Sequence, residues 1–272
     1  MQDLLYKVVD IATNASKIIM MYYNNLNDKE ITIKSDNTPL TRADLESNNF
    51  IMNELAKINS YKICSEEEIL NYEERKNLKY YWLLDPLDGT KDFIAKNGNF
   101  AINIALIYNN HPILGVIHAP ALEEVYFALQ DYGAFNLKIK SKIQTKLLGN
   151  KKSNNSKIIA CGSMFHNNDA TLNFAKKNNL QMIKKGSSLK FCSIADGSAD
   201  IYPRFNGSKE WDTAAGDIIV RESGGVVIDY KTKKQMVYNK ENIKNNYFIA
   251  FSKNQIEGDI YNKLMKKGAQ FN

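Results

Sequence analysis

Carboxylates gather in one short stretch of the sequence, WLLDPLDGTKDF. Asp85 and Asp88 stand directly behind an apolar run. Pro86 fixes one backbone angle and Gly89 reaches conformations that are costly for other residues, so a tight turn is expected. That turn would aim both carboxylates, with the carbonyl of Leu87 between them, at one point. Hard divalent cations such as Mg²⁺ prefer this set of oxygen ligands, and the stretch therefore suggests a metal site.

Two further acids stand at the ends of predicted elements. The stretch CSEEE ends a short strand at Glu66, and WDTAAGD places Asp212 at the start of a helix, where an anion meets the positive end of the helix dipole. Each motif alone also fits a solvated turn, a strand end or a helix cap. If the carboxylates converged without a metal, each pair ~4 Å apart would repel by about 4 kcal/mol at an effective dielectric of 20. Together, the motifs predict a site that holds more than one cation.

Composition limits the class of protein. The chain has 272 residues, of which 44% are hydrophobic and 24% charged, so a globular protein with a sizeable core is expected. No apolar run approaches the ~18 residues of a membrane span, and the opening residues lack the basic head of a secretory leader. Cys64, Cys161 and Cys192 are scattered, which fits a reducing cytoplasm and argues against a zinc site or a disulfide framework.

The net charge of +6 comes mostly from scattered lysines. A mild positive excess draws anionic substrates by long-range steering. A nucleic-acid polymer would need a dense, arginine-containing stripe, and only four arginines are present, so no nucleic-acid partner is expected.

Hydrophobic periodicity indicates the elements that carry these acids. Helical spacing is found over 3–24, in the run that follows Thr41, in WDTAAGDIIVRESGG, and finally over 254–268. Strand patterns include YYWLLD and three strands between Phe100 and Leu129. Helices and strands alternate, with meander strands mixed in, so a layered α/β sandwich is predicted. The Lys-, Ser- and Asn-rich residues 141–156 suggest a division into 1–145 and 146–272.

The motifs SEEE, WLLDPLDGTKDF and WDTAAGD resemble those of the inositol monophosphatase superfamily of metal-dependent, lithium-sensitive phosphatases. The resemblance implies the α-β-α-β-α sandwich of the inositol monophosphatase and fructose-1,6-bisphosphatase type. Most metal ligands would lie in an N-terminal α+β subdomain, with the remaining ligand and substrate contacts in a C-terminal α/β subdomain. GTKDF, NGNFAINIALI and PILGVIHAP are similar to the 3'(2'),5'-bisphosphate nucleotidases, which convert adenosine 3',5'-bisphosphate (PAP) to AMP and phosphate.

The resemblance also implies the metal ligands. Glu66, Asp85 and the Leu87 carbonyl would hold one Mg²⁺, and Asp85, Asp88 and Asp212 a second. Glu66 would also help to hold a weaker third ion through water. Bridging by Asp85 would set two ions ~3.5–4 Å apart, as in two-metal hydrolytic sites.

Catalytic roles follow from the same resemblance. Glu66 and Thr90 would orient a water, activated by the metals, that attacks phosphorus in line. Asp44 matches a position that assists this water, and it reads equally well as an acid of a helix's first turn. The expected substrate contacts are Leu87, Asp88, Gly89, Thr90, Ser187, Ser188, Lys190, Arg204 and Asp212.

The sequence departs from the nucleotidase pattern at the adenine end. These proteins often carry Ser-Arg-Ser-His after the first strand of the second half. Here CGSM occupies that place, so Gly162 replaces the arginine and Met164 the histidine, with His166 as a candidate substitute. An inositol-1-monophosphatase or broad sugar phosphatase is therefore the first alternative. The second is a non-catalytic regulatory binding protein, which would be expected to lack a ligand or Thr90.

The remaining expectations concern the partner molecule, the oligomeric state and the cellular location. The partner is a small phosphorylated molecule. Relatives occur as monomers or dimers, so a homodimer stays open. A cytoplasmic location is expected, and because some similar proteins are assigned to the inner membrane face, peripheral attachment there stays open too.

Overall fold

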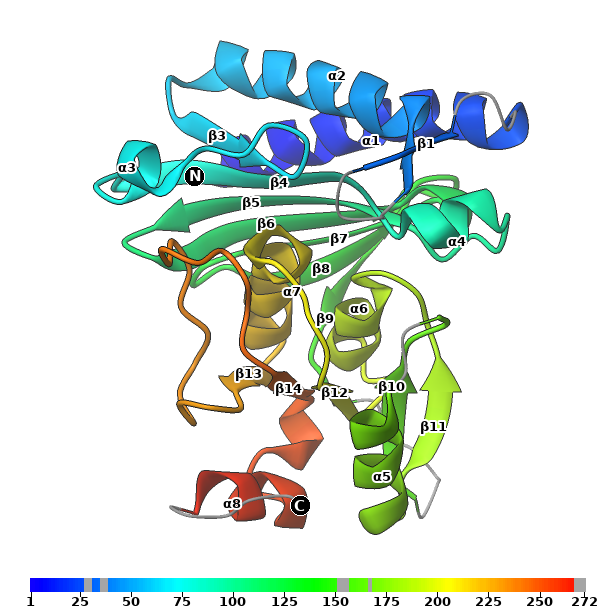
Figure 1. Cartoon of the computed structure of the whole chain (residues 1–272), viewed down its shortest axis with the longest axis vertical. Coiled ribbons are helices and arrows are strands. Elements are labelled where there is room, and N and C mark those ends of the chain that lie inside the picture. Colours follow the sequence, from blue (N-terminus) through cyan, green and yellow to red (C-terminus); the bar gives the residue numbers. More distant parts are fainter. Residues whose placement is uncertain (27–30, 35–38, 151–156, 166–167, 267–272) are drawn as a thin grey trace.

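Helices and sheets of the chain stack in five alternating layers (Figure 1). The computed structural model describes residues 1–26, 31–34, 39–150, 157–165 and 168–266. A pair of helices covers a seven-stranded sheet, a second pair lies beneath it, and a five-stranded sheet with two outer helices completes the stack. This order confirms the predicted α-β-α-β-α sandwich.

The larger sheet is an almost continuous meander. Its order along the sheet is β3 (Lys62–Ser65), β4 (Tyr80–Asp88), β5 (Ala101–Tyr108), β6 (His111–Ala119), β7 (Glu124–Leu129), β8 (Gly133–Lys138) and β9 (Ile143–Leu147). Strand β3 runs parallel to β4, and every other pair is antiparallel. Both faces of the central strands are buried, which explains why β4 and β5 read as nearly unbroken apolar runs.

The first helical layer packs on one face of this sheet. It consists of α1 (Gln2–Asn24) and α2 (Arg42–Ile58). Helix α1 buries a stripe at helical spacing that includes Leu5, Val8 and Ala12, and these side chains share a core with alternate residues of the sheet. A two-stranded ribbon of β1 (Ile31–Ile33) and β2 (Pro39–Thr41) leads into α2.

The middle helices are held against the opposite face by small residues. They are α6 (Leu189–Ala195) and α7 (Glu210–Glu222). A Cβ atom at Gly115 in β6 would lie 2.4 Å from Ile218 of α7, and one at Gly216 of α7 would lie 2.4 Å from Phe191 of α6. The close approach of these backbones fixes where α7 begins relative to the sheet.

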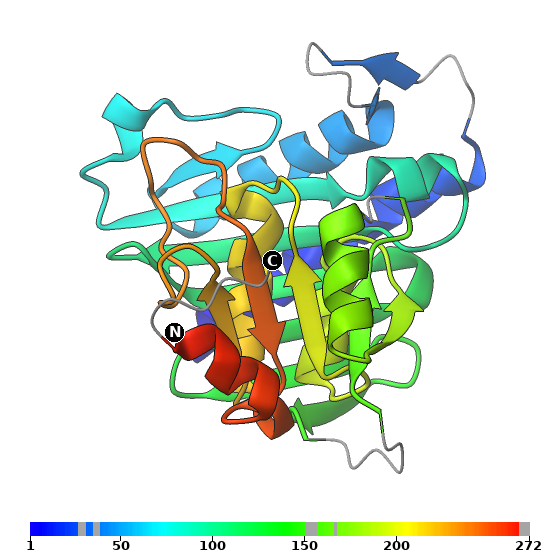
Figure 2. The same ribbon diagram turned by 60° about the horizontal axis from the view of Figure 1, so that its bottom comes forward.

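The second sheet forms the fourth layer. Its order is β11 (Gln181–Lys184), β10 (Ile159–Gly162), β12 (Ile201–Arg204), β14 (Phe248–Phe251) and β13 (Val226–Asp229). Strand β10 is parallel to both neighbours, and the remaining pairs are antiparallel. Figure 2 shows α5 (Asp169–Lys177) and α8 (Asp259–Met265) on its outer face.

Several elements differ from expectation. The final helix predicted over 254–268 is wrong in extent: a 3₁₀ turn at Lys253–Gln255 comes first, and α8 starts only at Asp259, after Gly258. Short helices α3 (Tyr72–Arg75) and α4 (Thr90–Ile94) were not anticipated. Strand β9 crosses the proposed boundary between residues 145 and 146, and the division into two subdomains stays a prediction.

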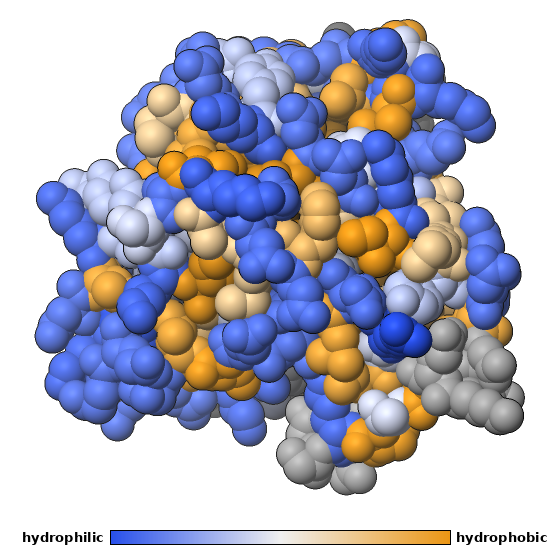
Figure 3. Space-filling view, turned by 90° about the horizontal axis from the view of Figure 1, so that it is seen from above, coloured by the Kyte–Doolittle hydropathy of each residue, from blue (hydrophilic) through white to orange (hydrophobic). Residues whose placement is uncertain are grey.

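The outward face over α1 and α2 is largely hydrophilic, with hydrophobic side chains showing in small groups between polar ones (Figure 3). Among the described residues, no helix combines the length and the apolar character that crossing a membrane requires.

Candidate active site

The turn after β4 departs from regular strand geometry at its two aspartates. Asp85 pairs with Asn103 of β5 and Asp88 pairs with Ala101, so an irregularity in register lies between them. The backbone N–H of Leu87 donates to Asp85 Oδ1 over 3.1 Å. Gly89 then adopts φ +90°, a left-handed conformation that favours glycine, and α4 begins at Thr90. The backbone therefore turns sharply where the carboxylates stand.

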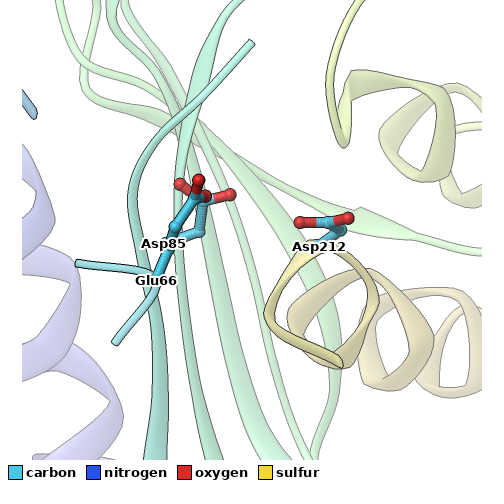
Figure 4. Close-up of side chains that lie close together, drawn as sticks. All are labelled: Glu66, Asp85 and Asp212. Atoms are coloured by element: carbon cyan, nitrogen blue, oxygen red, sulfur yellow. The ribbon is translucent and has the colours of Figure 1, made fainter. Parts of the chain in front are cut away.

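Three carboxylates from separate elements converge at this turn. One ligand oxygen each from Glu66, Asp85 and Asp212 lies within 4.8 Å of the others. Glu66 follows β3, Asp85 is in β4 and Asp212 lies in the first turn of α7. Figure 4 shows the Glu66 and Asp85 carboxylates side by side, with Asp212 facing them from the helix end. The sequence prediction that these three motifs meet is thus confirmed in space, while their role as ligands stays a proposal.

Burial makes this grouping costly in the absence of a cation. Burial first, then the charges of Glu66 and Asp88, raises the pKa of Asp85 well above its ordinary value. Burial, followed by Asp88 and Glu66, raises the pKa of Asp212 to about 7. The backbone N–H of Lys209 partly opposes this by donating to Asp212 Oδ2 over 2.7 Å. Carboxylates that repel in a buried place are the arrangement that a divalent cation stabilises.

A nearby lysine supplies part of the opposing charge. Lys34 Nζ lies 3.0 Å from Glu66 Oε1 and 2.6 Å from Glu67 Oε1. Burial lowers the pKa of Lys34, but the two glutamates outweigh burial and raise it above its ordinary value. Asp85 and Asp212 receive no such ion pair among the described residues. The lysine therefore balances the Glu66 side of the cluster, whereas Asp212 feels only the more distant charge of Arg204.

Asp88 lies beside this cluster but is turned partly away from it. Its Oδ2 accepts hydrogen bonds from the Ser187 hydroxyl at 2.5 Å, the Ser188 N–H at 2.6 Å and the Asn103 amide at 3.3 Å. No donor among the described residues contacts Oδ1. Asp88 can thus offer one oxygen to a cation while the other is held by protein.

Asp44 and Thr90 form a linked pair at the start of two helices. Asp44 Oδ2 accepts from the Thr41 N–H at 2.8 Å and the Thr41 hydroxyl at 2.6 Å, which caps α2. Asp44 Oδ1 faces the Thr90 hydroxyl at 3.2 Å, and that hydroxyl lies 3.3 Å from the Leu87 carbonyl. Burial raises the pKa of Asp44 to about 7. Asp44 therefore has one contact that fits a helix-capping acid and another that fits a residue assisting the water through Thr90.

A cavity of about 230 Å³ opens over the carboxylates. The predicted site residues that line it are Glu66, Asp85, Leu87, Asp88, Gly89, Thr90, Ser187, Ser188, Lys190, Arg204 and Asp212. Asp44 is the one predicted residue that does not line it, because it lies beneath Thr90. Ser163, Tyr202 and Ser208 line the cavity without having been predicted.

Two basic side chains, Lys190 and Arg204, also line the cavity. Lys190 is buried, and its Nζ donates to the Lys185 carbonyl at 3.3 Å and lies 5.4 Å from the centre of the Tyr202 ring. Burial lowers the pKa of Lys190 to about 8, and neighbouring Arg204 acts in the same direction. Arg204 donates through Nη2 to the Gly207 carbonyl at 3.0 Å, while its buried Nε has no partner among the described residues. Two cations close together suit an anion bound between them.

Ser187 and Ser188 lie at the cavity, as expected for substrate contacts, and that role stays a prediction. Within the protein, these two serines donate hydrogen bonds to Asp88 and Asn103. Gly162 ends β10 and Met164 is half-buried just beyond it. His166 lies outside the described residues. Asn103 was not singled out, although a lone amide within an apolar strand is a signal that could have found it.

The layers and the carboxylate cluster define an α/β protein with a candidate metal centre at the meeting of β4, α6, α7 and β12. The chain belongs to the inositol monophosphatase family, whose model matches residues 1–266.

Named relatives narrow the comparison. The 3'(2'),5'-bisphosphate nucleotidase CysQ of Buchnera aphidicola subsp. Acyrthosiphon pisum is 43% identical over 228 residues, covering 83% of this chain and 84% of the relative. The crystal structure of CysQ from Bacteroides thetaiotaomicron has a TM-score of 0.82 at 34% identity, covering 93% of this chain and 98% of that one. An IMPase from Thermotoga maritima has a TM-score of 0.79 at 25% identity, with 97% of each chain covered.

Proposed function

We propose that this chain is a Mg²⁺-dependent phosphomonoesterase that acts as a 3'(2'),5'-bisphosphate nucleotidase and releases phosphate from PAP to leave AMP. The observation that carries the proposal is a single cavity lined both by the converging carboxylates and by Lys190 and Arg204. The carboxylates suit cations and a phosphate to be cleaved. Lys190 and Arg204 suit a second phosphate, and relatives named as bisphosphate nucleotidases support that assignment.

The donor set fits Mg²⁺. Carboxylate and carbonyl oxygens are the ligands this ion prefers, and uncompensated repulsion at Asp85 and Asp212 is what its charge would relieve. Glu66, Asp85 and the Leu87 carbonyl would hold one ion, Asp85, Asp88 and Asp212 a second, and Glu66 would support a third. When bound, the ions would neutralise the negative charge that develops on the phosphate and would lower the pKa of a water molecule.

The chain's own residues orient the reacting groups. The Thr90 hydroxyl donates to Asp44 and would position a water next to Glu66. The N–H groups of Gly89 and Thr90 stand at the N-terminus of α4 and would hold phosphate oxygens.

The nearest alternative is an inositol-1-monophosphatase or a broad sugar phosphatase, which would use the same metal end. The similarity to the Thermotoga maritima IMPase supports this alternative. Lys190 and Arg204 argue for a substrate with a second anionic group, because two cations that line the same cavity can both contact one anion. A non-catalytic binding protein is not favoured, because each proposed ligand and Thr90 are present.

A phosphate-release panel tests the proposal. Purified protein would be given PAP, inositol 1-phosphate, fructose 1,6-bisphosphate or 5'-AMP with Mg²⁺, and again with excess chelator. The highest kcat/KM is expected for PAP, with AMP as the second product and no activity in chelator. A preference for inositol 1-phosphate would promote the alternative, and full activity in chelator would overturn the metal-dependent mechanism.

The cellular location and the oligomeric state stay proposals as well. Cys64, Cys161 and Cys192 are all free and buried, which is compatible with the cytoplasmic location that we propose. A homodimer and peripheral attachment to a membrane remain predictions from the resemblance alone.

A further inference from the structure

Asp88 is restrained far more tightly than the other carboxylates at the cavity. Three donors meet at its Oδ2: the Ser187 hydroxyl, the Ser188 N–H and the Asn103 amide. A carboxylate oxygen with three donors has no lone pair left for a cation. Only Oδ1 stays available, so the donors decide both the rotation of the carboxylate and which oxygen faces the cluster.

Asn103 organises this group of donors. It lies in β5 directly opposite Asp85 and is 1% exposed. Its Nδ2 donates to Asp88, while its Oδ1 accepts from the Ser188 hydroxyl at 2.6 Å. The reverse orientation of the amide would set Oδ1 against a carboxylate oxygen, so its contacts define which end is the donor. Asn103 therefore connects Asp88 to the start of α6.

The backbone of the second half is shaped to reach Asp88. Ser187 has φ +52°, a left-handed conformation uncommon for a residue with a Cβ atom. At Gly186 a Cβ would lie 2.4 Å from the Asn99 carbonyl oxygen and 2.9 Å from the Asp92 carboxyl carbon. The loop thus needs glycine for its close approach, and the strained residue that follows presents its hydroxyl to Asp88. Strain of this kind persists where surrounding contacts hold it.

We propose that Asn103 is a positioning residue for a divalent cation: with Ser188 it holds Asp88 so that Oδ1 alone faces the ion that Asp88 and Asp212 would share. The inference rests on the proposed function, because it takes Asp88 as a ligand. Its consequence is that metal affinity depends on a side chain that touches neither metal nor substrate. Groups that orient a ligand in this way typically change metal affinity by about 10- to 100-fold when removed.

Manganese binding provides the test. Free Mn²⁺ would be measured by electron paramagnetic resonance while the ion is titrated into chelator-stripped protein, beside PAP hydrolysis and thermal unfolding. Asn103→Leu should weaken the binding of one ion by about 10- to 100-fold. Asn103→Asp should weaken it at least as much, because a carboxylate would face Asp88. Ser188→Ala, which keeps the N–H donor, should cause a smaller loss and should not add to that of Asn103→Leu.

Asn136→Asp is the matched control. Asn136 is also a mostly buried amide in the same sheet, in β8, and donates to Glu124 at 3.4 Å. It should lower the unfolding temperature without altering Mn²⁺ affinity. If Asn103→Leu does not fold, Ser188→Ala alone decides between the outcomes.

The outcomes separate the two claims. Unchanged Mn²⁺ affinity in the Asn103 variants would overturn this inference. If the Asn103 variants do not fold, unchanged affinity in Ser188→Ala would overturn it instead. In either case, hydrolysis of PAP by the wild type would leave the proposed function standing. A wild-type chain that binds no Mn²⁺ and does not hydrolyse PAP would contradict the proposed function and this inference with it.

Discussion

At the scale of single residues, Asp44 has two contacts with different consequences. One oxygen caps α2 through Thr41, and the other faces the Thr90 hydroxyl. Asp44→Asn keeps an oxygen for the cap but turns an N–H₂ group toward Thr90. We expect kcat for PAP to fall by about 10- to 100-fold, as for loss of an orienting group, with little change in unfolding temperature.

The control for Asp44 is Glu74→Gln. Glu74 occupies the same position in the first turn of α3, where it accepts from the Asn71 N–H at 3.2 Å. That variant should leave kcat unchanged. Equal kcat values for Asp44→Asn and wild type would mean that Asp44 is only a capping acid.

Arg204 is proposed to contact the second phosphate of the substrate. Arg204→Ala would remove a charge-assisted contact worth about 1.5–3 kcal/mol. This corresponds to about a 10- to 150-fold loss in kcat/KM for PAP. Hydrolysis of inositol 1-phosphate should change far less, because it has no second phosphate to bind. A steady-state comparison of the two substrates would show equal losses if Arg204 were merely structural.

At the scale of elements, the position of α7 against the sheet sets the place of Asp212. Gly115→Ala in β6 would put a Cβ atom 2.4 Å from Ile218 and 2.7 Å from the Ala215 carbonyl oxygen. Overpacking of this kind costs about 1–3 kcal/mol of unfolding free energy. Because α7 must shift, PAP hydrolysis should also fall by about tenfold or more, as misplacement of catalytic groups predicts.

Denaturant titration and initial rates would check this prediction. Gly207→Ala is the control for stability, because a Cβ atom there meets nothing within 4 Å. An unfolding free energy of Gly115→Ala equal to that of the wild type would contradict this prediction, because it would show that α7 can move away from the sheet without loss of stability.

At the scale of the whole molecule, one buried histidine links stability to pH. His118 in β6 is 2% exposed, and neither ring nitrogen has a partner among the described residues. Burial lowers its pKa from 6.5 to about 4. The unfolded chain therefore takes up a proton first, and stability that is complete above about pH 6.5 is lost as the pH falls toward 4.

His118→Leu tests this dependence. Between pH 7 and pH 5 the histidine should remove about 2 kcal/mol of unfolding free energy, and the variant should escape that loss. Urea titrations at the two pH values would measure it, with His111→Leu, an exposed position in the same strand, as the control. An identical pH dependence in His118→Leu and wild type would refute it.

The sequence predicted those parts of the fold and site that depend on local order. Glu66, Asp85 and Asp212 each stand at the end of an element with a strong pattern, and ends of elements meet at layer boundaries. Asn103 could not be assigned in this way, because its role depends on the register of β4 against β5. Strand β9 was missed because four of its five residues are exposed and its pattern resembles a loop.

Long-range contacts explain the rest of what the sequence did not indicate. Arg75 in α3 donates to Asn239 over 3.0 Å, and the Asn239 N–H donates to Glu210 at the start of α7. These residues are widely separated along the chain, and nothing in their local spacing pairs them. The network nevertheless joins the segment after Glu66 to the helix that carries Asp212.

The measurement that tests the central claim most directly is the initial rate of phosphate release from PAP as Mg²⁺ is added back to chelator-stripped protein, with wild type beside Asp85→Asn. Asp85 is the carboxylate proposed to be shared by two ions. Wild type should rise from no activity to a saturating rate. Asp85→Asn should stay folded but remain at least ~10²-fold slower at every Mg²⁺ concentration, as for removal of a major electrostatic contributor. Wild-type turnover without Mg²⁺, or near wild-type turnover by Asp85→Asn, would contradict the account.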